Sequence, residues 1–113
     1  MSDEGYKTSP VVGYVRSAML NDPRLDEWEA QIRTYAAERG YNLVRVYREE
    51  ATSGTRNVKP ILQQILDSVH VGRYVGLITP SLAHLSSTPS AAARIVHQIN
   101  HNAWIQFLVN LQE

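Results

Sequence analysis

The chain contains no cysteine, which excludes disulfide bonds, thiolate catalysis and cysteine-ligated metals. It also lacks any apolar run long enough to span a bilayer, and its start has no signal-peptide pattern. These features suit a cytoplasmic protein. We therefore expect a cytoplasmic location.

The chain also lacks a charge excess of either sign. Eleven basic residues balance eleven acidic ones, whereas domains that bind DNA on their own usually carry a basic excess. Local basic patches can still form around Arg16, Arg56 and Lys59. We expect at most weak DNA binding by the isolated chain.

A length of 113 residues with 43% apolar residues predicts one globular domain. We expect residues 1–10 to form a flexible N-terminus and residues 11–113 the domain. Strands are predicted at 11–16, 43–47, 74–79 and 104–111, with helices between them. This alternation predicts an α/β fold, namely a mainly parallel four-stranded sheet with helices on both faces.

Helix boundaries are marked by capping signals. Asp22 is the predicted cap of the first helix, with Pro23 in its first turn and Gly40 at its end. Lys59-Pro60 opens the second helix, and Ser87 or Thr88 caps the third ahead of Pro89. In strand 43–47, the period of two predicts that Val44 and Val46 share one face.

Several short motifs occur in the order found in the serine recombinases of the resolvase/invertase family. The first strand ends in Tyr14-x-Arg16-x-Ala18, where that family has Tyr-x-Arg-x-Ser. The later matches are Trp28-Glu29-Ala30-Gln31, the Glu50-to-Gly54 loop with Glu50 and Ser53, and Lys59-Pro60. The chain therefore resembles the catalytic domain of serine recombinases from Val11 to Leu111.

The resemblance breaks at the residues that the family uses for chemistry. Ala18 stands where the family has the serine that attacks DNA. In the segment Leu82-Ala83-His84-Leu85-Ser86-Ser87, the family's acid is replaced by Ala83 and its two phosphate-binding arginines by His84 and Ser87. Arginine binds phosphate oxygens bidentately at any working pH, which neither replacement does.

The resemblance thus implies a site without catalytic residues, whose vestigial positions are Tyr14, Arg16, Ala18, Glu50, Ser53, Lys59, Ala83, His84 and Ser87. Ser17 is predicted to point away from Arg16 and residue 18, because successive strand side chains alternate. A register slip would be needed to make it a nucleophile.

Two hypotheses concern the basic residues that are left. Arg16, Ser53, Arg56 and Lys59 can form an anion-binding pocket at the start of the helix that Pro60 opens. The alternative, which we favour, is that Arg16 pairs with Glu49 or Glu50. His84 is expected to be a solvent-exposed loop residue. No metal site is predicted, because His97 and His101 have no evident third ligand, and no cofactor is predicted.

The leading functional hypothesis is a catalytically inactive serine-recombinase-like domain that acts as an interaction or regulatory module. The alternatives are an active DNA recombinase and a non-catalytic DNA-binding regulator. The family's long oligomerisation helix and DNA-binding domain lie beyond its last strand, and we expect both to be absent from this chain. We expect a protein partner or self-association, and no membrane or small-molecule substrate. The interface is predicted at Ala91, Ala92, Ile95 and Trp104.

Overall fold

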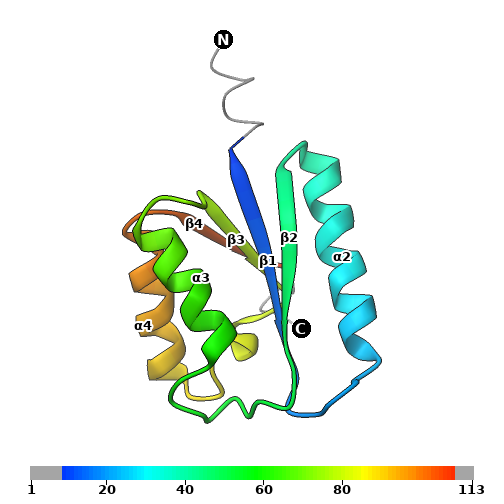
Figure 1. The fold of residues 1–113 in the computed structure, drawn as a ribbon, viewed down its shortest axis with the longest axis vertical. Helices are drawn as coiled ribbons and strands as arrows, with labels where there is room; N and C mark the ends of the chain where they lie inside the picture. Colours follow the sequence, from blue (N-terminus) through cyan, green and yellow to red (C-terminus); the bar gives the residue numbers. More distant parts are fainter. Residues whose placement is uncertain (1–8, 109–113) are drawn as a thin grey trace.

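The computed structural model describes residues 9–108, which form a four-stranded sheet covered by helices (Figure 1). Along the chain the elements are β1 (Pro10–Arg16), α2 (Arg24–Arg39), β2 (Asn42–Glu49), α3 (Pro60–His70), β3 (Gly76–Thr79), a 3₁₀ turn η1 (Leu82–His84), α4 (Pro89–Asn100) and β4 (Trp104–Phe107). The strand order is β2-β1-β3-β4, and all neighbouring pairs are parallel. The predicted fold class is confirmed.

The helices divide the core into two layers. One cluster lies between the sheet and α2, and includes Val11, Val15 and Ile32. The other lies between the sheet and α3 with α4, and includes Val12, Tyr14 and Ile65. Alternate residues of β1 therefore supply opposite faces, as the period of two requires. Within residues 9–108, no helix combines the length and the apolar character needed to cross a bilayer.

Some boundaries differ from those predicted. Helix α2 begins at Arg24, one residue later than predicted, with Pro23 before it. Asp22 still caps this end, because its carboxylate accepts the Arg24 N–H at 2.9 Å and its carbonyl accepts the Leu25 N–H at 3.0 Å. Strand β2 extends to Glu49, beyond the predicted end at Tyr47. Strand β4 ends at Phe107, and positions 109–111 of the predicted strand lie outside the described residues.

The prediction that Val44 and Val46 share a face is wrong. Val11 pairs with Leu43 and Val12 pairs with Arg45, so Val44 forms a bulge in β2. The extra residue shifts the alternation. Leu43 and Val46 therefore both pack toward α2, while Val44 is half-exposed.

Candidate functional site

The ends of three parallel strands meet at one edge of the sheet. β1 ends at Arg16, β2 at Glu49 and β3 at Thr79, and the loops that follow are bonded to one another. The Ser17 N–H donates to the Glu49 carbonyl at 2.9 Å, and the Ser87 N–H donates to the Gly54 carbonyl at 3.0 Å. This is the edge where open α/β sheets bind ligands.

The Arg16 side chain is held by backbone carbonyls. Its Nε donates to the His84 carbonyl at 3.2 Å, Nη1 to that of Thr52 at 3.0 Å and Nη2 to that of Ala83 at 2.9 Å. Gly54 packs so closely here that a Cβ at that position would lie 2.8 Å from Nη2. Arg16 thus ties the 50–59 loop to the 80–88 loop.

The favoured pairing of Arg16 with Glu49 or Glu50 is wrong, since neither carboxylate contacts its guanidinium. Glu49 is 2% exposed. Its Oε1 accepts the Tyr14 hydroxyl at 2.7 Å and the Leu62 N–H at 2.9 Å, and its Oε2 accepts the Ile61 N–H at 2.8 Å. Glu50 accepts the Asn21 N–H at 2.8 Å.

Glu49 therefore occupies the N-terminus of α3, where the anion-pocket hypothesis places a ligand. A carboxylate satisfies the free N–H groups and favours the positive end of the helix dipole. Burial and the neighbouring Glu49 raise the pKa of Tyr14 well above its ordinary value, so its hydroxyl stays protonated and donates to the carboxylate. The chain supplies its own anion at this position.

The other candidates for the anion pocket are arranged differently. Lys59 is buried and its Nζ donates to the Arg56 carbonyl at 2.8 Å. Burial, and secondarily the charge of Arg16, lower the pKa of Lys59. The Ser53 hydroxyl lies 2.9 Å from that of Thr55, within its own loop, and Arg56 is exposed.

His84 is buried, and the expectation of an exposed loop histidine is wrong. Its Nδ1 accepts the Arg16 N–H at 3.0 Å, and its ring meets the Trp28 ring edge-on with centroids 4.5 Å apart. Burial, with the charges of Arg16 and Arg24, lowers the pKa of His84 to about 4. A neutral imidazole thus links β1, η1 and α2.

The two residues after β1 differ in exposure and chemistry. Ala18 is exposed and has no polar side-chain atom. Ser17 is 3% exposed; its hydroxyl donates to Asp22 Oδ2 at 2.7 Å and accepts the Met19 N–H at 3.0 Å. Hydrogen bonds from Arg24 and Ser17 hold the pKa of Asp22 far below its ordinary value. The Ser17 hydroxyl is therefore buried in a hydrogen bond to an internal carboxylate.

Comparison with protein-family models identifies the family of the chain. The family model for the resolvase N-terminal domain matches residues 11–111. The chain belongs to this family. No curated protein matched the sequence.

Three solved structures share the fold of this chain. The C-terminal catalytic domain of ISC1926 TnpA, an IS607-like serine recombinase, has 17% identity and a TM-score of 0.82 over 92% of this chain and 70% of its own. The N-terminal catalytic domain of TP901-1 integrase has 19% identity and a TM-score of 0.77, covering 88% and 77%. The first ORF in transposon ISC1904 from Sulfolobus solfataricus P2 has 18% identity and a TM-score of 0.72, covering 88% and 67%.

In this resolvase-family domain, the positions of the segment Leu82–Ser87 that differ from the family's motif lie around Arg16. Ala83 contributes its carbonyl, His84 its ring nitrogen and its carbonyl, and Ser87 its N–H to Gly54. Ala83 and Ser87 are exposed. The structure thus brings Arg16, His84 and the Ser53 loop together at one edge.

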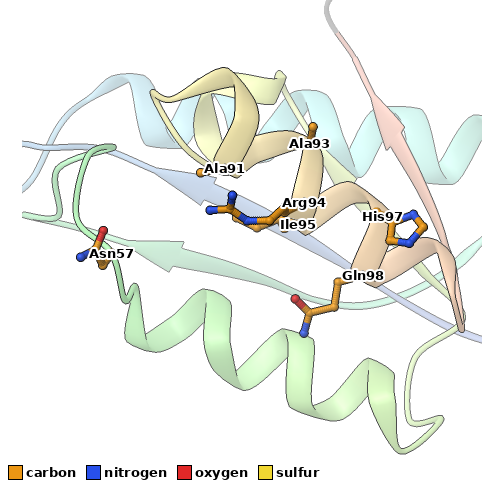
Figure 2. Close-up of a pocket in the computed structure, with 7 residues that line it drawn as sticks. All are labelled: Asn57, Ala91, Ala93, Arg94, Ile95, His97 and Gln98. Atoms are coloured by element: carbon orange, nitrogen blue, oxygen red, sulfur yellow. The ribbon is translucent and has the colours of Figure 1, made fainter.

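The predicted interface residues do not form one surface. Ala91 and Ile95 line a groove beside α4 (Figure 2), whereas Ala92 is fully buried. Trp104 packs in the α2-side layer, covering Gly76 and contacting Tyr41. The rings of His97 and His101 lie 5.2 Å apart, and no third metal-ligating side chain joins them within residues 9–108.

Sequence reasoning missed Glu49 as the capping group of α3. The sequence offered only a weak signal, since Glu49 lies two residues after the predicted strand 43–47 and ten before Lys59. The bond between Ser17 and Asp22 had a weaker signal, a serine five residues before an aspartate. Neither spacing specifies which carboxylate turns inward.

Proposed function

We propose that this resolvase-family domain does not cleave DNA and acts through contacts with another protein. The observation that carries the proposal is the absence of an available hydroxyl at the end of β1. Ala18 has none, and the hydroxyl of Ser17 is buried against Asp22. Phosphoryl transfer needs a positioned nucleophile and positioned positive charge.

The arrangement of the charged side chains at this edge of the sheet supports the same proposal. Arg16 directs its donors to three backbone carbonyls, and Glu49 occupies the nearby helix terminus. A phosphate entering this edge would have to displace carbonyl contacts and would meet an internal carboxylate. The absence of cysteine suits the reducing cytoplasm, which we propose as the location.

The test is incubation of the full chain with supercoiled plasmid. We expect no nicked or linear product on agarose gels, and no nucleotide adduct in the intact mass of the chain after nuclease digestion. An active serine recombinase with its own site serves as the positive control.

The Ser17→Ala variant makes the test specific. Nicking by the unaltered chain that disappears in this variant, with the variant still folded, would identify Ser17 as a working nucleophile. The alternative of an active recombinase would then replace the proposal.

A further inference from the structure

Two histidines at the end of α4 lie next to each other on the surface. His97 is in the last turn of the helix, and His101 is the residue that follows it. His101 keeps a helical backbone conformation, so the two side chains, four residues apart, lie on one face. Both residues are exposed, and their ring centroids are 5.2 Å apart.

The ring nitrogens of this pair have no other partner within residues 9–108. Neither side chain forms an ion pair or a hydrogen bond there, whereas the Nδ1 atom of buried His84 accepts the Arg16 N–H. Helix α4 contains no acidic residue. Its charged side chain, Arg94, extends toward the loop that carries Asn57 (Figure 2). The pair is therefore available to a ligand that imidazole nitrogens bind.

The spacing of the two rings fits a tetrahedral zinc ion. Imidazole nitrogens bind zinc at about 2.0–2.1 Å, which places each ring centroid about 3.2 Å from the ion. Two such centroids are about 5.2 Å apart at the tetrahedral angle, and about 4.5 Å apart at the right angle of octahedral or square-planar ions. The observed separation of 5.2 Å matches the tetrahedral value.

We propose that His97 and His101 bind a zinc ion, and that a second copy of the chain completes the site with the same two residues. Tetrahedral zinc sites in proteins have four ligands, and no third metal-ligating side chain joins this pair within residues 9–108. A two-fold axis through the ion supplies four imidazoles from two α4 helices. The inference goes beyond the proposed function and does not depend on it.

The surface beside the pair allows a second α4 helix to approach. Helix α4 lies at the outer edge of the molecule, with α3 beside it (Figure 1). Ala93, one turn before His97, is exposed and small, so it leaves room for the backbone of another helix. The formal net charge of zero gives little long-range repulsion between copies.

The test measures the mass of the full chain, without a purification tag, by sedimentation equilibrium. Metal is first removed with a chelator, and zinc chloride is then added in steps. We expect the mass to double, with one zinc ion bound per two chains. Magnesium chloride should leave the mass unchanged, because Mg²⁺ prefers oxygen ligands.

His97→Asn and His101→Asn should each weaken zinc binding at least tenfold and abolish the doubling, because each variant removes one ligand from both copies. His70→Asn makes the same replacement at an exposed histidine at the end of α3 and should change the affinity by less than twofold. Because all three histidines are exposed, the variants are expected to fold, which circular dichroism checks.

Co²⁺ in place of Zn²⁺ reports the coordination, since tetrahedral Co²⁺ absorbs visible light much more strongly than octahedral Co²⁺. An octahedral spectrum would overturn the proposal, as would binding of one zinc ion per chain without a change in mass. Doubling that survives in the His97 and His101 variants, or that needs no zinc, would also overturn it. None of these outcomes produces nicked plasmid, so failure here is separate from failure of the non-cleaving assignment.

Discussion

Individual side chains at the end of β1 are used for internal contacts. Ser17 donates to Asp22, Arg16 donates to carbonyls, and His84 accepts the Arg16 N–H. Each contact satisfies a polar group that would otherwise be costly to bury. The residues that remain from the family motif therefore work as supports for the loops.

Ala18→Ser alone should not restore DNA cleavage. The new hydroxyl would face a site in which Ala83, His84 and Ser87 replace the charged residues implied by the family motif, and residues that act as a unit fail together. The plasmid assay checks this, with intact-mass analysis for a protein–DNA adduct. A detectable adduct at residue 18 would show that Arg16 can leave its carbonyl partners and suffice by itself.

Stability should fall as pH decreases from about 6.5 toward 4, because of His84. Its pKa is about 4 in the fold and 6.5 otherwise, so the unfolded chain binds the proton first. This linkage amounts to about 3 kcal/mol at most. Urea unfolding at pH 5.5 and pH 7 measures part of this change. At these pH values Asp22 and Glu29, whose pKa values are lowered from 3.8 and 4.5, keep their contribution to stability.

The matched variant is His84→Asn, whose Oδ1 can accept the same Arg16 N–H without taking up a proton. We expect it to reduce this pH dependence. The same replacement at His70, which is exposed, should leave the pH dependence of stability unchanged. A pH dependence unchanged in His84→Asn would refute the assignment.

At the scale of elements, β1 and α2 approach each other at a glycine. A Cβ on Gly13 would lie 2.9 Å from Ile32 Cγ2 and 3.1 Å from Val46 Cγ2. The absence of a side chain there lets α2 lie close against the centre of the sheet. The bulge at Val44 contributes by turning Leu43 and Val46 toward the same helix.

Gly13→Ala should destabilise the fold by roughly 1–3 kcal/mol through overpacking. Ile32→Ala removes the nearest atoms and should cost about 2–5 kcal/mol alone. Because the two changes relieve each other, the double variant should cost less than the sum by about 1 kcal/mol. Urea unfolding of the three variants tests this coupling, and strictly additive costs would contradict it.

Across the whole molecule, the charges balance but are unevenly placed. Helix α2 holds four acidic residues, whereas α3 and α4 together hold one, Asp67. Most acids of α2 are offset by arginines on α2 or β2. Arg33, Arg39 and Arg48 are therefore paired with carboxylates within the described part of the chain.

Binding to a labelled DNA duplex should be weak, with a dissociation constant above about 100 µM at physiological salt. Fluorescence anisotropy measures it. The double variant Glu27→Lys, Glu38→Lys raises the net charge by four and should tighten binding and steepen its salt dependence. Submicromolar binding by the unaltered chain would instead favour a DNA-binding regulator.

The sequence by itself determined the element order and the parallel sheet. Apolar periodicity is local, and capping signals such as Pro60, Pro89 and Gly40 act within a single turn. It also determined that position 18 carries no hydroxyl, because an alanine has none in any fold.

Only the tertiary structure decided which polar groups meet. Glu49 caps a helix that starts eleven residues later, Arg16 crosses to carbonyls of two separate loops, and His84 is buried under Trp28. The bulge at Val44 depends on pairing with β1, so its own segment could not reveal it. Such contacts join residues distant in sequence, and burial decides which of several available partners each group takes.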